Sequence, residues 1–451
     1  MSQEKPVNNT DFKSLGIRGT LLHTLEKVGY NTATPIQVQA IPRLLEGKDL
    51  LGVAQTGTGK TAAFGLPLIQ RLIEEDKPAE SRRPKALILA PTRELALQIH
   101  EEMVRLSKGS KLRTTFVFGG VGQNPQVKAL ARGVDILVAT PGRLLDLAAQ
   151  GHLKLSELSV LVLDEADRLL DMGFIRDVKR IVSQTPKSRQ SLLFSATMPK
   201  EVAALAREIL RKPIRVDVSP KEITVKEIDQ RVVYVGNGNK QYMLDHLLRD
   251  VAVTRAIVFT RTKHGADKVT RKLLKSGISA EAIHGNKSQN ARQRALQNFK
   301  QGRSWVLVAT DIAARGIDIE GVSHVFNYEL PHEPESYVHR IGRTGRAGAK
   351  GIAWALVDPS ETKRLRAIER LIKFSPTEEI VDLPPRPEGE VAEVEPQRNS
   401  NNNNSRNSNP RNRRRKGPPR QRDRTSNDKS TQSSEDKPNR PNRKRKRRQA
   451  A

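Results

Sequence analysis

The sequence predicts an α/β protein with two tandem parallel-sheet domains, followed by a basic tail. Along residues 12–375, short apolar runs rich in Val, Ile and Leu alternate with amphipathic stretches of helical length. This alternation is typical of a buried parallel sheet that helices cover on both faces. The rhythm stops at a polar segment around 213–229 and then starts again, which indicates a second domain of the same class. The loss of apolar residues after 396 predicts the tail.

Six apolar runs predict the strands of the first domain, which we expect over residues 12–215. They are residues 49–55, 85–91, 114–120, 135–141, 160–166 and 191–197, and helical spacing is found at 62–74, 93–107 and 201–210. The second domain, expected over 228–375, has runs at 231–236, 256–262, 280–285, 305–311, 324–330 and 352–357. Residues 1–11 are then an N-terminal extension, 216–227 a linker and 376–396 a Pro/Glu-rich linker.

The composition limits the classes of protein to which the chain can belong. Its 451 residues include 79 Lys and Arg but 50 Asp and Glu, a net charge of +29, and no Cys. A chain without Cys cannot form a disulfide scaffold, a thiolate metal site or a cysteine nucleophile, and the nine His form no tight ligand cluster. It has no run of 18 apolar residues and no leader-like start, so we expect a cytoplasmic protein with no membrane partner. The positive charge indicates a polyanionic partner, nucleic acid before membrane.

The charge is concentrated in the tail, residues 397–451, which has 19 Lys and Arg against 4 Asp and Glu. Its Asn, Ser, Pro and Arg residues cannot bury enough surface to offset chain entropy, so we expect it to be disordered. It can neutralise phosphates but offers no aromatic side chain for stacking, which predicts a tether for RNA. A solubilising tail without a partner is the alternative. RKRKRR at 443–448 would imitate a nuclear import signal in a nucleated cell.

A phosphate-binding loop is predicted at 54–61, AQTGTGKT, between an expected strand and an expected helix. The sequence matches the generic phosphate-loop pattern except that Ala54 stands where that pattern has its first Gly. Gly57 and Gly59 let the backbone N–H groups turn inward toward phosphate oxygens at a helix N-terminus. Lys60 would place an ammonium on the outer phosphates, and Thr61 would offer a hydroxyl to Mg²⁺. A glycine turn that only joins strand to helix is the alternative.

A pair of acids follows the apolar run VLVL, in the sequence DEAD at 164–167. Their place after a strand puts Asp164 and Glu165 where open α/β sheets bind ligands. We expect Asp164 to hold Mg²⁺, partly through water, and Glu165 to orient or deprotonate the attacking water. Two acids at this position can also be a simple helix N-cap. The phosphate loop upstream favours the catalytic interpretation.

These two motifs and those named below resemble the DEAD-box ATP-dependent RNA helicases of superfamily 2, most closely their bacterial RhlE-like branch. The likeness covers about residues 12–375 and implies two tandem RecA-like domains, with ATP and Mg²⁺ as cofactors. It implies that RNA is bound along its backbone with weak sequence preference, and that short duplexes are unwound locally or RNA–protein complexes remodelled. Ribonucleoprotein or RNA-decay partners are possible expectations of the family. The physiological RNA is left open.

By this resemblance, Gln37 in GYNTATPIQ reads adenine and Phe12 stacks on it, although a plain core aromatic is the alternative for Phe12. The family usually has Pro where this chain has Ala33. Arg343 and Arg346 in HRIGRTGR (339–346) resemble arginine fingers, since a planar guanidinium suits the charge spread of phosphoryl transfer. The implied catalytic residues are Lys60, Asp164, Glu165, Arg343 and Arg346. The implied nucleotide-binding residues are Phe12, Gln37, Ala54, Gln55, Thr56, Gly57, Thr58, Gly59, Lys60, Thr61, Asp318, Arg343 and Arg346, with Thr61 and Asp164 at the metal.

The same resemblance implies RNA contacts from loops of both domains. These are Pro91, Thr92, Arg93, Gly120, Thr140, Gly142, Arg143, Arg261, His284, Gly285, Thr310 and Asp311, with Gln289 and Arg292 as weaker candidates. Exposed strand ends with small residues let backbone N–H groups reach phosphates, but helix caps and turns would use the same residues. The residues implied to couple hydrolysis to strand separation are Asp167, Ser195, Thr197 and His339. A simple helix entry before Pro199 is the alternative for SAT (195–197).

The division of catalytic residues between two domains predicts that the ATPase site is complete only when both domains contribute. RNA binding and ATP binding should then strengthen each other. A DNA-directed helicase or translocase on the same motor is one rival, and an RNA-binding or annealing protein with an ATP clamp is another. A small-molecule kinase is disfavoured because no acceptor-binding domain is left over.

Overall fold

The structure is a computed structural model that describes residues 10–55, 57–218, 228–236, 238–314, 319, 321–345 and 350–382, with backbone alone at Ile312 and Ala314. The described residues fall within one compact unit. The predicted tail and most of the two predicted linkers lie outside the described residues. No helix in the described part of the chain is long and apolar enough to cross a membrane.

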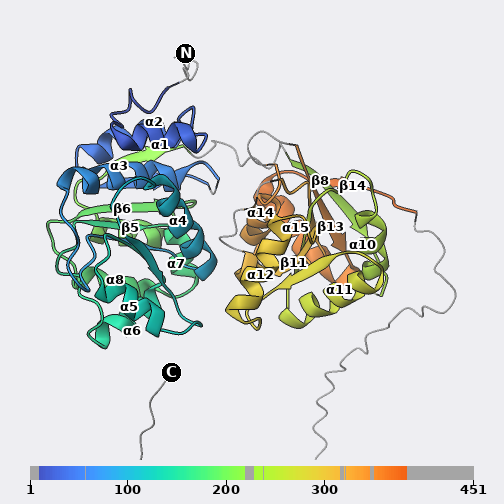
Figure 1. The fold of residues 1–451 in the computed structure, drawn as a ribbon. Coiled ribbons are helices and arrows are strands. Elements are labelled where there is room, and N and C mark those ends of the chain that lie inside the picture. The colour runs from blue at the N-terminus through green and yellow to red at the C-terminus, as the bar shows by residue number, and fades with distance from the viewer. Residues whose placement is uncertain are drawn as a thin grey trace, which may run out of the picture. The chain divides into compact units, whose positions relative to one another are not determined.

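The first domain is a seven-stranded parallel sheet in the order β3-β4-β2-β5-β6-β1-β7 (Figure 1). Its strands are β1 (Leu50–Val53), β2 (Ala86–Leu89), β3 (Thr114–Val117), β4 (Ile136–Ala139), β5 (Val160–Leu163), β6 (Gln190–Ser195) and β7 (Ile214–Asp217). The central strands are apolar on both faces because side chains alternate along a strand and both faces are covered. Residues 86 and 88 of β2, for example, pack in one core and residues 87 and 89 in the other.

Two layers of helices cover this sheet, each with its own core. The first layer is α1 (Thr20–Lys27), α2 (Pro35–Leu45), α3 (Lys60–Glu75) and α4 (Arg93–Leu106). The second is α5 (Asn124–Ala131), α6 (Pro141–Ala149), α7 (Ala166–Asp171), α8 (Ile175–Ser183) and α9 (Lys200–Ile209). Caps begin several helices as the sequence suggests: Thr92 Oγ1 accepts from the Leu95 N–H at the start of α4, which satisfies an N–H that the helix cannot.

The second domain repeats the sheet with the order β10-β11-β9-β12-β13-β8-β14. Its strands are β8 (Ile228–Tyr234), β9 (Ala256–Thr260), β10 (Ala280–Ile283), β11 (Val306–Thr310), β12 (His324–Asn327), β13 (Gly351–Val357) and β14 (Thr377–Glu378). One face carries α10 (Lys240–Leu248) and α11 (Lys263–Lys275). The other carries α12 (Gln289–Lys300), α13 (Asp311–Ala314), α14 (Pro334–Ile341) and α15 (Thr362–Ile372), and the short 3₁₀ helix η2 (Pro359–Glu361) precedes α15.

All twelve predicted strands are confirmed, and the sequence analysis missed two more at the edges. β7 was assigned to the boundary and linker region because only Val216 of its four residues is buried. β14 has two exposed residues and is defined by its pairing with β8, which no local pattern announces. The first sheet therefore runs past the expected boundary at 215, and the second past 375.

Candidate nucleotide and RNA site

Three loops that follow neighbouring strands meet at one edge of the first sheet. Strand β6 lies between β1 and β5, with Val53 of β1 paired to Ser195 of β6. All three strands are parallel, so their carboxyl ends lie at the same edge. The loop 54–59, the acids at 164–167 and residues 195–197 therefore come together where open α/β sheets bind ligands.

The loop 54–59 has the backbone that a phosphate site requires. Gly57 and Gly59 have φ values of 86° and 88°, in the left-handed region that favours glycine. A Cβ on Gly59 would lie 2.5 Å from Nε2 of Gln37, so only glycine fits at this approach. Lys60 begins α3, is 6% exposed, and donates from Nζ to the Ala54 carbonyl at 3.0 Å. The lysine is thus held over the loop that it would serve.

The predicted adenine reader Gln37 is fully buried and ties two loops together. Its Oε1 accepts from the Thr34 N–H at 2.9 Å, and its Nε2 donates to the Gly59 carbonyl at 3.1 Å. Phe12 is 2% exposed and packs edge-on against Tyr30 at a centroid distance of 6.0 Å. Both side chains therefore lie inside the protein in this structure, and their contacts with adenine stay predictions.

Ala33, the departure from the family pattern, makes a bond that proline could not. Its N–H donates to the Thr10 carbonyl at 3.1 Å. Proline has no N–H to donate. The hydrogen bond fastens the segment that carries Phe12 to the loop that carries Gln37, so the substitution does not simply loosen this region.

The two acids after β5 are buried beside a basic side chain. Burial raises the pKa of Asp164 to about 6, against the opposing charge of Lys60 and with the added charge of Glu165. Glu165 has a φ of 51° and pairs through Oε2 with Nη1 of Arg168 at 2.6 Å. Arg168 follows the DEAD sequence directly and was given no role by the sequence analysis. Its position three residues after Glu165 was the available signal.

The third loop makes the hydrogen bonds that the sequence analysis expected. The Asp167 N–H donates to Oγ of Ser195 at 3.1 Å, and Oδ2 of Asp167 accepts from the Thr197 N–H and hydroxyl at 2.8 and 2.9 Å. Ser195 in turn donates to the Thr197 carbonyl at 2.7 Å. The bonds link the loop after β6 to the start of α7. Their role in coupling stays a prediction.

In the second domain, Arg340 is the centre of a buried network that the sequence analysis missed. It is 1% exposed, and its guanidinium donates to both carboxylate oxygens of Asp311 at 2.5 and 2.8 Å. It also bonds the Asn327 side chain and the Glu329 carbonyl and lies over the Phe259 ring. Asp311, expected to lie near RNA, is thus an ion-pair partner in this structure. Three elements supply the partners, so sequence spacing could not reveal them.

Other predicted residues of the second domain also bond within that domain. Arg343 is 6% exposed and donates from Nε to the His339 carbonyl at 3.2 Å. Arg261 pairs with Glu329 at 3.0 Å. His284 is 2% exposed, with its Nε2 3.0 Å from the Asp267 carboxylate, so its side chain is turned away from solvent. Thr56, Asp318 and Arg346 lie outside the described residues.

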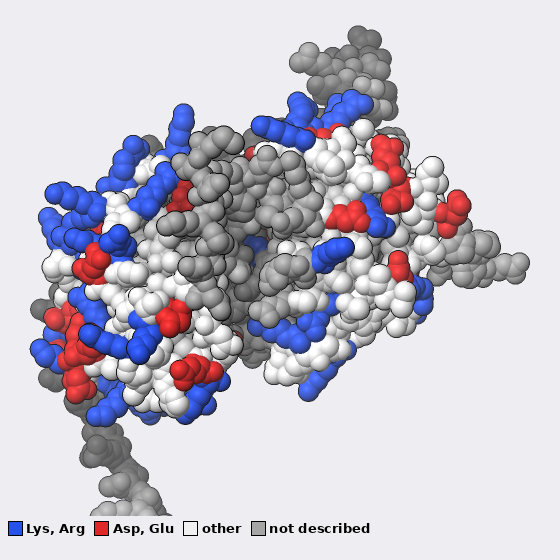
Figure 2. All heavy atoms as spheres, turned by 90° about the horizontal axis from the view of Figure 1, so that it is seen from above, with Lys and Arg blue, Asp and Glu red and all other residues white. Residues whose placement is uncertain are grey.

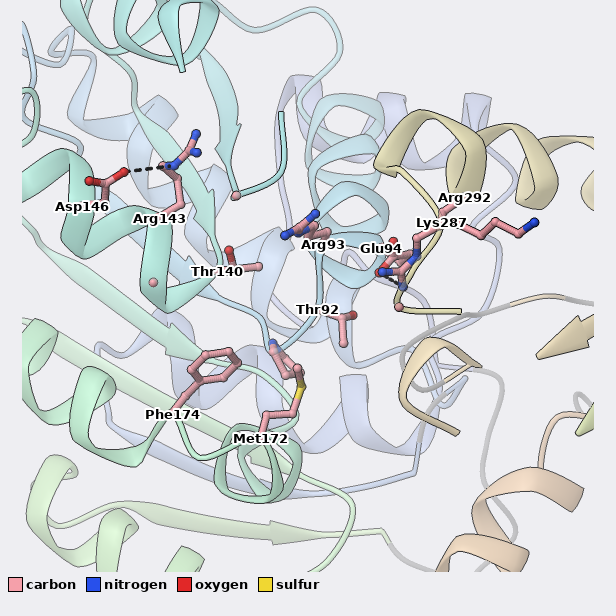
Figure 3. A pocket seen from close by; sticks show the side chains of 14 residues that line it. Thr92, Arg93, Glu94, Thr140, Arg143, Asp146, Met172, Phe174, Lys287 and Arg292 are labelled. Carbon is pink, nitrogen blue, oxygen red and sulfur yellow. Dashed lines mark ion pairs between the residues drawn. The ribbon is translucent and has the colours of Figure 1, made fainter. Parts of the chain in front are cut away.

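Seven of the twelve predicted RNA contacts line one cavity of about 510 Å³ (Figure 3). Its lining residues are Pro91, Thr92, Arg93, Glu94, Gly119, Thr140, Gly142, Arg143, Asp146, Met172, Phe174, Gly285, Lys287 and Arg292. Gly120 stands beside it with a φ of 77°, and a Cβ there would lie 1.9 Å from Nη1 of Arg93. Glycine therefore lets the arginine occupy this wall.

The cavity also has residues that the sequence analysis did not place at a site: Glu94, Asp146, Met172, Phe174 and Lys287. Glu94 accepts from Nη2 of Arg292 at 3.0 Å and from Nε2 of Gln289 at 2.9 Å, and Arg143 pairs with Asp146 at 3.3 Å. Its cations are thus partly neutralised by carboxylates. The single signal in the sequence was the placement of Glu94 and Asp146 near Arg93 and Arg143.

Comparisons with known proteins agree with this geometry. Residues 34–205 match the DEAD/DEAH box helicase family and residues 239–348 the helicase conserved C-terminal domain. DEAD-box ATP-dependent RNA helicase CshA of Bacillus cereus is 46% identical over 364 residues, which cover 81% of this chain and 68% of that protein. ATP-dependent RNA helicase CshA of Listeria monocytogenes is also 46% identical, covering 81% and 69%. The chain belongs to the DEAD-box ATP-dependent RNA helicases.

Solved structures of DEAD-box helicases share the two-domain RecA-like fold. Dbp5 of S. cerevisiae bound to RNA and ADP BeF3 is 32% identical, with a TM-score of 0.73 over 82% of this chain and 95% of that one. Mss116 bound to single-stranded RNA and UDP-BeF is 29% identical, with a TM-score of 0.75 over 84% and 81%. The expected RhlE-like branch is not supported, because these curated relatives are CshA proteins. The DEAD-box helicase described here is an ATP-dependent RNA helicase and RNA-stimulated ATPase.

Proposed function

We propose that this helicase hydrolyses ATP at the edge of the first sheet, with arginines of the second domain completing the site. Lys60, Asp164 and Glu165 would act from the first domain. Arg343 and Arg346 would act from the second. The observation that carries the proposal is the convergence of the loops after β1, β5 and β6, which brings Lys60 and the two acids to one edge.

The contacts of these residues give the proposal a physical form. Lys60 donates to the Ala54 carbonyl, Glu165 pairs with Arg168, and Arg343 donates to the His339 carbonyl. Each group thus has a partner within its own domain. Binding of ATP must replace these partners by phosphate oxygens and the attacking water. The exchange gives RNA and nucleotide a common state to favour, which is the condition for reciprocal coupling.

The residues fit ATP and Mg²⁺. Phe12 and Gln37 would hold adenine, Asp318 the ribose, and the loop 54–61 the phosphates. The Asp164 carboxylate and the Thr61 hydroxyl are hard oxygen donors of the kind that Mg²⁺ prefers. No group of three acidic or His ligands exists among the residues described, so phosphates and water would supply the other ligands. The ion would neutralise phosphate charge, while Glu165 orients water and the arginines stabilise the departing phosphate.

RNA would be held along its backbone by the loops that line the cavity around Arg93 and Arg143. Contacts with ribose hydroxyls would favour RNA over DNA and leave sequence preference weak. Closing on ATP would unpair a short duplex locally, and hydrolysis would release the strand. The tail at 397–451 would add a salt-sensitive tether. We place this activity in the cytoplasm, on ribonucleoprotein or RNA-decay substrates.

Arg343→Ala in the full chain tests the shared site. Loss of an arginine finger should lower the RNA-saturated kcat by on the order of 10³-fold, because such a group acts on transition-state charge. Arg271→Ala on the exposed face of α11 is the matched control and should leave kcat unchanged. A kcat of Arg343→Ala within a factor of two of wild type would refute the assignment. Equal stimulation of wild type by matched single-stranded RNA and DNA would instead favour a DNA-directed motor.

A further inference from the structure

Helix α15 carries a stripe of four cations on its exposed side. Lys363, Arg366, Arg370 and Lys373 are spaced by three, four and three residues, which places them on one face of a helix. All four are exposed. The opposite side of α15 packs Leu365 and Ile368 into the core of the second domain. We call these four residues the basic stripe.

The basic stripe is not explained by the folding of α15. Among the described residues none of its four cations forms an ion pair, whereas the neighbouring Arg364 pairs with Glu361 at 3.4 Å. Like charges three and four residues apart repel each other along a helix. The face drawn in Figure 2 shows basic side chains interspersed with acidic ones. Four unpaired cations in a row therefore differ from an ordinary solvated surface.

Aromatic surface lies beside these charges. Phe374 follows the stripe and is 43% exposed, which is unusual for a large apolar side chain. It lines a surface hollow of about 480 Å³ with Arg366, Glu369, Arg370, Lys373 and Ser375. Tyr234 of β8 is 51% exposed, and the charges of Glu369 and Arg366 act on its hydroxyl. Cations and exposed rings on one surface are the two components of a platform for single-stranded nucleic acid.

We propose that the basic stripe and Phe374 form a second RNA-binding surface, which takes a single strand running beyond the site between the catalytic loops. The proposal rests on the RNA helicase function above. The stripe would hold phosphates, and Phe374 would stack on a base. A duplex keeps its bases stacked on each other, so the surface should select single strands. The basic tail starts at residue 397, 24 residues beyond Lys373, and so can add to the same strand.

The test uses the full chain with Lys363, Arg366, Arg370 and Lys373 all changed to Gln, a good helix former. The Kd for a labelled 25-nucleotide oligo(U), measured by fluorescence anisotropy, should rise about tenfold at low salt. The slope of log Kd against log salt should fall by up to about 3, because each phosphate contact on a single strand contributes about 0.7. The thermal midpoint should not fall, since the buried face of α15 is intact.

The matched control removes the same charge elsewhere. Lys128, Arg132, Arg271 and Lys275 are exposed cations of other helices or their ends, and all four are changed to Gln. This variant should keep the wild-type Kd within about twofold. If the two quadruple variants bind RNA equally, the stripe has no specific role and the proposal fails.

Phe374→Leu separates stacking from charge attraction. It should weaken oligo(U) binding about fivefold and leave binding of a blunt duplex unchanged, since base–aromatic stacking needs unpaired bases. In wild type, 4-thiouridine in the oligomer should crosslink to the peptide that contains Phe374. Unchanged binding by Phe374→Leu, or equal competition by tripolyphosphate and oligo(U) at matched phosphate concentration, would show a general anion surface and overturn the proposal.

The ATPase distinguishes this inference from the function on which it rests. The stripe variant should keep the RNA-saturated kcat of wild type and require about tenfold more RNA for half-maximal stimulation. A wild-type ATPase that RNA does not stimulate would refute the proposed function. A stripe variant with unchanged RNA requirement would refute the inference alone.

Discussion

The two sheets have the same strand order, and each begins with a strand, a loop and a helix whose first residue is lysine. In the first domain β1 leads to α3 at Lys60, and in the second β8 leads to α10 at Lys240. Lys60 donates to a carbonyl of its own loop. Lys240 instead pairs with the buried carboxylate of Glu361 and with Asp358 at 3.2 Å, and donates to the Tyr328 carbonyl.

This difference teaches that the strand, loop and lysine do not make a phosphate site by themselves. Glu361 is fully buried, and it also accepts from the Leu330 N–H and pairs with Arg364. The ammonium of Lys240 is therefore neutralised inside the protein and is not available to phosphate. Lys60 has one neutral partner that a phosphate oxygen can replace. One site serves the nucleotide and the other stabilises the domain.

Lys240→Met should break the comparison most strongly. Removing one member of a buried ion cluster leaves Glu361 without its cation, which typically costs about 3–5 kcal/mol. Both Trp residues of the chain, Trp305 and Trp354, lie in the second domain, so Trp fluorescence during urea unfolding reports this loss. ATP binding to folded protein should be nearly unchanged. A variant that loses nucleotide binding but not stability would show that Lys240 also binds phosphate.

Lys60→Met should have the opposite signature. Loss of a preorganised cation at the phosphates should lower the RNA-stimulated kcat at least about 100-fold, or about 2.7 kcal/mol. The unfolding transition seen by Trp fluorescence should not move, because Lys60 lies in the other domain and loses one hydrogen bond to Ala54. Steady-state hydrolysis with RNA in excess measures the first effect. Hydrolysis at the wild-type rate would contradict the distinction between the two lysines.

Asp164→Asn should give the smallest effect and a characteristic pH dependence. The folded-state pKa of Asp164, about 6, lies above the 3.8 of an exposed carboxyl, so folding disfavours its charged form. The contribution of this group to stability therefore falls as pH rises from about 4 to 6 and stays low above 6. Asn should raise the stability of the first domain at pH 7.5, and the gain should vanish below about pH 4. Calorimetry without Mg²⁺ or nucleotide measures the difference, and a gain that persists at pH 4 would contradict the sign.

Much of the first domain's site followed from the sequence because its signals are local. Fully apolar runs identified twelve strands, and the glycines and lysine of 54–61 lie in one loop. Buried parallel strands need no distant partner to be recognised, since their residue types already state their environment. The hydrogen bonds of Asp167 with Ser195 and Thr197 came from the family pattern and were found in place.

Tertiary structure decided which charges are available. Lys240 and Glu361 are 121 residues apart, and Arg340 takes partners from several elements. The burial of Phe12 and Gln37 and the pairing of β14 with β8 also depend on contacts between distant segments. Sequence alone determined the two sheets, the phosphate loop and the positions of the acids. Only folding determined that one lysine faces a replaceable carbonyl and the other a buried carboxylate, because the electrostatic environment of a side chain is set by whatever the fold brings within a few ångströms.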